Sequence, residues 1–323
     1  MKKVHIKSLV STVVVVLFVC VAVWYVAANY DDFARIAITN PLMLIPAALF
    51  VLINIYGAGV VIDLAVEPHG VKLSRKEAFG LAAITRFSNQ FSPSYINATI
   101  RATYLKRTYG ITYAKFSSSF LISSLLQFMV TGAMILITFL AMNNLSTVNT
   151  PLIAIGVALL IFVVILYIPL GKVIKFLNKK MDRGNKISHL YGRLSDMLVG
   201  YETVRKHPGL FSRTFIQMVI NIIALALVYF TLFEALGIHT TILQTMFIAS
   251  FTNWSVLFSV TPGNLGVREG LMVVSAGIAG VSIPATLLVA IMIRLITFAI
   301  SGGLATYYTP LILNKSLFNL RSK

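Results

Sequence analysis

Two short polar stretches contain the residues of this sequence with the clearest potential to bind a charged ligand. The first, SPSYINATIR, contains Ser92, Pro93, Asn97 and Arg101. The second, TPGNLGVRE, contains Thr261, Pro262, Gly263, Asn264, Gly266, Arg268 and Glu269. Proline interrupts a helix, and the backbone N–H groups at the start of the helix that follows attract anions. A neighbouring guanidinium adds a bidentate fork for phosphate, so we expect the two stretches to form one anion-binding site.

Other charged residues also fall in or near apolar runs. A charge at the centre of a bilayer costs at least about 2.5–3.5 kcal/mol, so such residues usually face a cavity or a partner. We expect Arg294 to face the same cavity, either paired with Glu269 or lining the path, and we count it with the binding residues. Glu269 is expected either to form a stabilising ion pair or to act as a titrating counterion. Arg86 is expected to reach the cytoplasmic interface.

Amide side chains are a further polar group in these apolar runs. We expect them to form hydrogen bonds between helices rather than to bind substrate. They are Asn54, Asn89, Gln90, Gln127, Asn221 and Asn253.

The sequence offers little to support catalysis. The five His residues fall in loops or interfacial segments without metal-ligand spacing, and the single Cys20 lies in an apolar run. Nucleophile elbows, phosphate-binding loops and zinc-protease motifs do not occur at a usable position. We therefore expect no catalytic residue, no metal and no cofactor, and a protein that is not an enzyme. Any transport would then be facilitated or coupled to a gradient.

The composition is that of an integral membrane protein. Hydrophobic residues make up 58% of the chain, charged residues only 11%, and the mean hydropathy is +0.86. The net charge of +17 comes from Lys and Arg residues that lie between the apolar runs. This placement argues against a nucleic-acid partner. It indicates that the basic residues set the membrane topology and attract anionic lipid head groups at the inner leaflet.

The apolar runs define the elements that must position the two polar stretches. Membrane spans are expected at 8–28, 41–66, 116–142, 151–170, 210–236 and 284–307. Residues 78–91 are too short to cross, so 78–113 is expected to form a re-entrant hairpin, and 242–283 a second one. The basic segment 172–208 is expected to form amphipathic helices on the cytoplasmic side, or a solvated linker. The distribution of basic residues places both termini in the cytoplasm of a bacterial or archaeal cell, with the chain crossing the cell membrane several times.

A spacing of 169 residues relates the two halves of the chain. Adding 169 to Pro93 gives Pro262, and the same offset aligns the spans that flank the two stretches. A single unpaired span, 151–170, lies between the copies, so the second must be inverted relative to the first. We therefore expect an all-α polytopic bundle forming one transmembrane domain, 1–323. Its inverted repeats cover about 41–142 and about 210–311, each with a broken re-entrant hairpin, an architecture typical of secondary transporters.

The two stretches resemble those of a known family. SPSYINATIRATYLKRTYG and TPGNLGVREG are similar to the flippase-like transmembrane region of lysylphosphatidylglycerol synthases, which has a P-G-x-x-G-x-x-E turn in its second half. Here that turn is formed by Pro262, Gly263, Gly266 and Glu269. The first stretch has Ser94, Tyr95 and Asn97 in place of a glycine-rich turn. The resemblance covers about residues 8–310 and does not include the soluble aminoacyl-transferase domain of the synthases.

The resemblance implies a lipid translocase. Its partner would be a membrane phospholipid, which could be aminoacylated, held at the paired broken helices and moved between leaflets. A transporter of polyprenyl-phosphate-linked sugars is a second reading, because the same anion site would serve it. An intramembrane enzyme acting on lipid phosphates and a scaffold without transport activity are further alternatives. The sequence leaves a homo-oligomer open.

Overall fold

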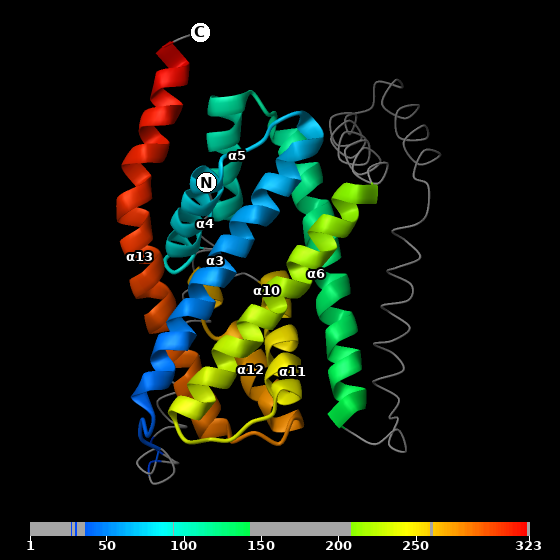
Figure 1. Ribbon diagram of the computed structural model, residues 1–323, viewed down its shortest axis with the longest axis vertical. Helices are drawn as coiled ribbons and strands as arrows, with labels where there is room; N and C mark the ends of the chain where they lie inside the picture. The colour runs from blue at the N-terminus through cyan, green and yellow to red at the C-terminus, as the bar shows by residue number, and fades with distance from the viewer. Residues whose placement is uncertain are drawn as a thin grey trace, which may run out of the picture.

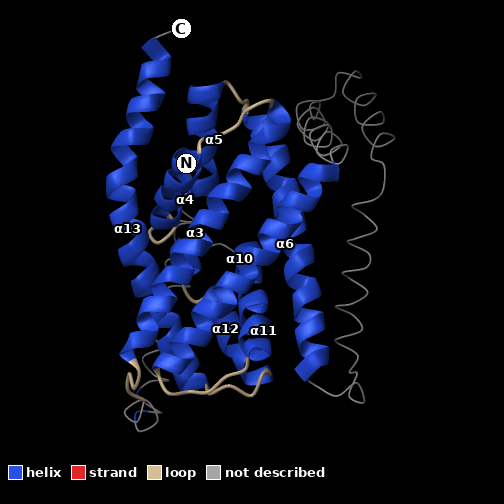
Figure 2. Cartoon of the chain, in the orientation of Figure 1, coloured by secondary structure: helices blue, strands red, loops and turns tan. Residues whose placement is uncertain are grey.

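The computed structural model describes residues 27, 30, 36–92, 94–142, 208–258 and 261–321. These residues form eight α-helices and no strand (Figure 2), which confirms the predicted all-helical bundle. Almost all of the predicted span 8–28, the whole of the span 151–170 and the basic segment 172–208 apart from its last residue lie outside the described residues.

The first half of the bundle contains two long helices and a helical hairpin between them. A single 3₁₀ turn, η1 (Pro41–Met43), leads into α3 (Leu44–Val66). After a second turn, η2 (Glu67–His69), come α4 (Arg75–Ser88), α5 (Ser94–Tyr109) and α6 (Tyr113–Met142).

The second half has the same order of elements. It consists of α10 (Pro208–Ala235), α11 (Ile242–Asn253), η4 (Trp254–Phe258), η5 (Pro262–Asn264), α12 (Val267–Ile278) and α13 (Ile283–Arg321). Within the hairpin expected over 242–283, the first helix ends as an α-helix at Asn253 and continues as the tighter 3₁₀ turn η4, a common way for a helix to end.

The corresponding helices of the two halves run in opposite directions. In Figure 1, α3 rises where α10 descends, and α6 descends where α13 rises. Adding 169 to Val66, the end of α3, gives Ala235, the end of α10. The same offset takes Tyr109, the end of α5, to Ile278, the end of α12. This order and these directions are those that two inverted repeats require, while the repeat boundaries at 41–142 and 210–311 stay predictions.

Side-chain caps begin the first helix of each hairpin. Ser74 Oγ accepts a hydrogen bond from Glu77 N at 3.3 Å and so starts α4 three residues before the expected segment. Thr241 and Gln244 form a reciprocal capping box at the start of α11. Each cap satisfies backbone N–H groups that have no partner inside the helix, which fixes where the hairpin departs from the preceding loop.

The two halves are packed into each other. Helix α3 lies along α10, and α4 packs between α3 and α13. Helix α11 packs between α10 and α6 in the same manner. The contact of α4 with α13 is aromatic: Phe79 meets Tyr308 edge-on at 5.7 Å between ring centroids, and Phe87 lies 5.4 Å from Phe298. Each hairpin is therefore held by a long helix from the other half.

Four of the described helices are long and apolar enough to cross a membrane. The corresponding segments are Pro41–His69, Tyr113–Met142, Gly209–Ala235 and Ile283–Leu313. Helices α4, α5, α11 and α12 have 12 to 16 residues, which makes them about 18–24 Å long and too short for a hydrocarbon core of about 30 Å. The described part of the chain thus combines spanning helices with half-length ones.

Candidate functional site

The turns of the two hairpins touch. Gly263 N–H donates a hydrogen bond to the carbonyl oxygen of Ser92 at 3.4 Å. The backbone of Gly263 is left-handed, with φ of 60°, and a Cβ there would lie 3.1 Å from the carbonyl oxygen of Asn89 and 3.2 Å from that of Gln90. Glycine is required because it tolerates this φ and leaves room for the other chain. The predicted meeting of the two breaks is therefore present, although Pro93 itself lies outside the described residues.

The second turn is held by its own polar side chains. Thr261 is buried, and its Oγ1 donates to Leu265 O at 2.8 Å, across the 3₁₀ turn that begins at Pro262. Asn264, with a positive φ of 53°, donates from Nδ2 to Ser255 O at 3.2 Å. These hydrogen bonds fix the irregular backbone of TPGNLG, which has no helical ladder to satisfy its polar groups.

Glu269 and Arg294 form an ion pair that supports the same turn. Arg294 donates to Glu269 Oε1 at 2.6 Å and to the Gly263 carbonyl oxygen at 3.2 Å. The other Glu269 oxygen accepts the Gly266 N–H at 2.8 Å. The Glu269 side chain is 9% exposed and that of Arg294 21%. Of the two roles expected for Arg294, the structure shows the pairing with Glu269.

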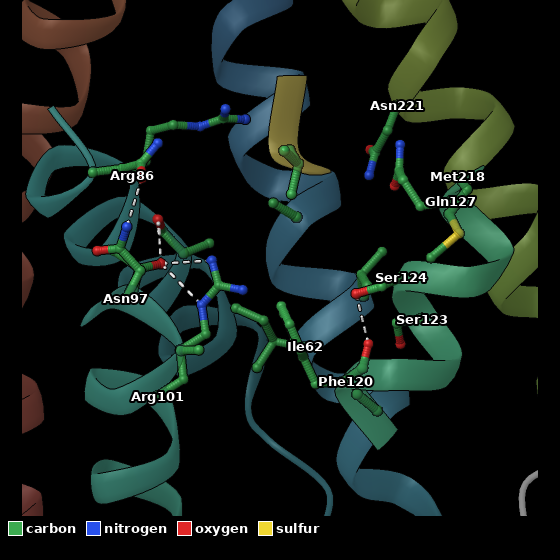
Figure 3. Close-up of a pocket in the computed structure, with 18 of the residues that line it drawn as sticks. Ile62, Arg86, Asn97, Arg101, Phe120, Ser123, Ser124, Gln127, Met218 and Asn221 are labelled. Atoms are coloured by element: carbon green, nitrogen blue, oxygen red, sulfur yellow. Dashed lines mark hydrogen bonds between the residues drawn. The ribbon is translucent and has the colours of Figure 1, made fainter. Parts of the chain in front are cut away.

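A central cavity lies beside the meeting turns. It consists of two connected spaces of about 290 and 200 Å³ that share seven lining residues. The two spaces together are called the central cavity, and the residues that line both are Ala58, Arg86, Asn89, Gln127, Asn221, Asn253 and Val256. Figure 3 shows part of this space, with Arg86, Asn97 and Arg101 on one side and Gln127 and Asn221 on the other.

Three arginines face the central cavity. Arg101 donates twice to Thr85 Oγ1, at 3.1 and 2.9 Å. Arg86 donates to Asn54 Oδ1, and Arg268 to Tyr229 OH at 3.3 Å. None of the three forms an ion pair with a carboxylate of the described residues. Their like charges repel, Arg86 against both Arg101 and Arg268, so the cavity carries positive charge that an anion would offset.

Amide groups complete the polar wall. Asn97 is buried and donates from Nδ2 to Asn89 Oδ1 at 2.7 Å, while its own Oδ1 has no hydrogen-bond partner among the described residues. Asn221 lies close to α3 because Gly57 has no side chain: a Cβ on Gly57 would lie 1.8 Å from Asn221 Oδ1. Such groups can bind the polar atoms of a head group around the phosphate.

The residues predicted from the sequence fall into two sets. Asn97, Arg101, Gly263, Asn264 and Arg268 line the cavity. The others shape or support the turns: Ser92, whose carbonyl accepts from Gly263, and Thr261, Pro262, Gly266, Glu269 and Arg294.

Sequence reasoning missed several lining residues. Arg86 lines the cavity rather than reaching the interface, because α4 turns its side chain toward Asn54 on α3. The amides Asn54, Asn89, Gln127, Asn221 and Asn253 also line it, in addition to any hydrogen bonds between helices. One available signal was that Arg86 interrupts a stretch too short to cross, where a charge has no nearby interface. No group of three metal-binding side chains occurs in the part of the chain that the structure describes.

A comparison with protein families gives one match that covers most of the chain. Residues 6–304 match the family described as the lysylphosphatidylglycerol synthase TM region. None of the curated proteins gives a significant match. The match includes both hairpins and most of the last long helix, and it confirms the resemblance found in the two polar stretches. The chain therefore belongs to the family of the lysylphosphatidylglycerol synthase transmembrane region.

Proposed function

We propose that the protein is a lipid translocase that carries an anionic lipid head group between leaflets through the central cavity. The family supports a role connected with membrane lipids. The observation that carries the proposal is the group of three arginines in one polar cavity without a carboxylate partner among the described residues. A cluster of like charges in a membrane-embedded site is costly, so its retention favours a role in binding.

Phosphate is the anion that this arrangement suits. Arg86, Arg101 and Arg268 present planar forks that can bind phosphate oxygens bidentately. Helices α5 and α12 both begin near the meeting turns, so the positive ends of their dipoles lie at the same level as the arginines. A lipid phosphate in the cavity would offset the repulsion among the three guanidiniums, because its negative charge attracts each of them.

The proposal includes an orientation in the membrane. Basic residues of the helix ends and of one loop gather at the end of the bundle where α3 ends and α10 begins (Figure 1): Lys72, Arg75, Lys76, Lys106, Arg107, Lys115 and Arg213. At the opposite end, the described loops 36–40, 236–241 and 279–282 contain no Lys or Arg. By the positive-inside rule, the basic end would lie in the cytoplasm, together with the C-terminus. The hairpins would enter the membrane from opposite faces, as inverted repeats, in a multi-pass protein of the cell membrane.

A leaflet assay on proteoliposomes tests the function. Fluorescent phosphatidylglycerol placed in one leaflet should become accessible in the other at a rate set by wild-type protein. Arg101→Ala and Arg268→Ala should each slow this at least about tenfold, because a lost charge-assisted hydrogen bond costs about 1.5–3 kcal/mol. Arg213→Ala is the matched control, since Arg213 is exposed and pairs with Glu67 at the surface. Equal rates for all four proteins would rule the proposal out.

The same assay separates the alternative substrates. The anion site suits the phosphate of a polyprenyl-linked sugar as well as that of a phospholipid. Unlabelled polyprenyl phosphate that competes more strongly than unlabelled phosphatidylglycerol would assign the site to the polyprenyl carrier. Recovery of chemically altered lipid after incubation would instead support an intramembrane enzyme.

A further inference from the structure

An apolar groove lies between α5 and α6, beside the central cavity. It has a volume of about 390 Å³, within the range of ligand-binding pockets. Small residues on one face of α5, including Ala98 and Ala102, form one wall. Aromatic and aliphatic residues on α6, including Tyr113, Phe120 and Leu121, form the other.

The groove adjoins the central cavity. Ala98, Phe116, Phe120 and Ser124 line both the groove and the larger part of the cavity. The α6 residues that line the groove recur three and four positions apart, so they form one stripe along the helix. Beyond these shared residues the cavity holds Arg101 and Asn97, while the groove is lined by residues of α5 and α6.

Few contacts close the groove. Helix α6 packs mainly on α11 and much less on α5. Phe120 is 40% exposed and Tyr113 46%. At the basic end, the Lys106 ammonium lies 4.5 Å from the centre of the Tyr113 ring, where it could also meet a phosphate. A lipid could therefore slide between α5 and α6 with its charged end leading toward the arginines.

From this geometry we infer that the groove between α5 and α6 binds an acyl chain of the phospholipid whose phosphate lies in the central cavity. The inference rests on the proposed function for the identity of the lipid. The apolar groove matches a hydrocarbon chain, while its connection to the arginine-lined cavity matches the phosphate at the end of that chain. The lipid would remain partly in the bilayer as its head group occupies the polar space.

A photoaffinity experiment reads the groove directly. Phosphatidylglycerol with a diazirine in one acyl chain is added to wild-type protein in vesicles, irradiated, and the labelled peptides are identified by mass spectrometry. We expect label on the peptides of α5 and α6 that contain Thr99, Ser117 and Leu121. Ser117→Trp, which places a large ring in the groove, should reduce this label at least about fivefold, as steric overfilling does at packed contacts.

A control on the same helix separates blocking from general damage. Ala133 is an exposed small residue of α6 that lines neither the groove nor the central cavity. Ala133→Trp should leave the labelling unchanged. Thermal unfolding of both variants should match that of the wild type, so that any loss of label reflects the groove.

The outcomes distinguish the groove from the function. If Ser117→Trp does not reduce the labelling, the groove does not bind the acyl chain, whatever the rate of translocation. Stronger labelling of these peptides by a diazirine-bearing polyprenyl phosphate would overturn the acyl-chain assignment. Labelling that is lost in Ser117→Trp would support the groove even if the wild type moved no lipid in the leaflet assay, a result that would defeat the proposed function alone.

Discussion

The ion pair of Glu269 with Arg294 gives a quantitative test of how the second turn is held. We consider the variants Glu269→Leu, Arg294→Met and the double substitution. Glu269 accepts from Arg294 at 2.6 Å and from Gly266 N at 2.8 Å, and Arg294 also donates to the Gly263 carbonyl. Both side chains are largely withdrawn from solvent, so removal of either partner leaves the other charge without compensation.

The two single variants and the double variant should differ in a characteristic way. Removing one partner of a buried pair costs about 3–5 kcal/mol, while replacing both by apolar residues of similar size is often close to neutral. We expect each single variant to lose about 3–5 kcal/mol of unfolding free energy. The double variant should lose about 1–3 kcal/mol, because the Gly266 N–H remains without its acceptor. The resulting coupling energy should be at least about 3 kcal/mol.

Reversible unfolding in mixed detergent micelles, followed by circular dichroism, measures these free energies. The exposed pair of Arg213 with Glu67 provides the control cycle. It has a similar separation of 2.6 Å but side chains that are 55% and 42% exposed. Its coupling should be below about 1 kcal/mol because solvent screens the charges.

Additivity would refute this reasoning. If the losses in Glu269→Leu and Arg294→Met summed to that of the double variant within about 0.5 kcal/mol, the two residues would not act as a unit. A double variant as stable as the wild type but inactive in the leaflet assay would instead show that the pair serves the shape of the turn more than the stability of the fold.

Three further predictions concern packing and charge. Gly263→Ala should lower the free energy of unfolding by about 1–3 kcal/mol, because Gly263 has a left-handed φ and lies close to Asn89 and Gln90. Gly270→Ala, where a Cβ meets no atom within 4 Å, should be neutral or stabilising, and thermal unfolding compares the two variants. Gly59→Ala should lower the free energy of unfolding by about 1–3 kcal/mol in the same assay, because its Cβ would lie 2.8 Å from the Ala78 carbonyl oxygen. Gly303→Ala should leave stability unchanged, because a Cβ there would meet open space. Equal stability of the two variants would contradict the close approach of α3 to α4. Arg86→Gln should stabilise the lipid-free protein by about 0.5–2 kcal/mol, because it relieves repulsion from Arg101 and Arg268. The same variant should slow lipid translocation. A destabilised variant would show that the protein itself already compensates the charge of Arg86.

Most of the helical architecture could be predicted because it follows from local signals. Hydropathy located α3, α6 and α10 to within three residues at each end, since each is a long apolar run. It located the start of α13 to within one residue, but α13 continues 14 residues past the predicted end at 307. The offset of 169 residues indicated which elements correspond and that the two turns would meet. The end of α11 at Asn253 depends on how the chain bends toward the other turn, which no local pattern specifies.

The composition of the cavity was harder to predict because it depends on which way each helix face turns. Arg101 and Arg268 could be found because each follows a helix break. Asn221 could not, since a polar residue in an apolar helix can face either a neighbouring helix or a cavity. For Arg86 the sequence offered one signal, its position in a stretch too short to cross the membrane. The tight approach at Gly57, which brings Asn221 against α3, decides the matter for that residue and is visible only in three dimensions.

The packing of α13 on α4 affects how the protein folds during its synthesis. The ribosome completes Ser88 about 195 residues before it reaches Ile283, a delay of about 10–40 s at about 5–20 residues per second. Throughout that interval the first hairpin, with Arg86 and Arg101, lacks the aromatic cover of Phe298 and Tyr308. We expect a membrane chaperone to bind the nascent chain in this state. Proteins truncated before α13 should be degraded by quality-control proteases rather than accumulate.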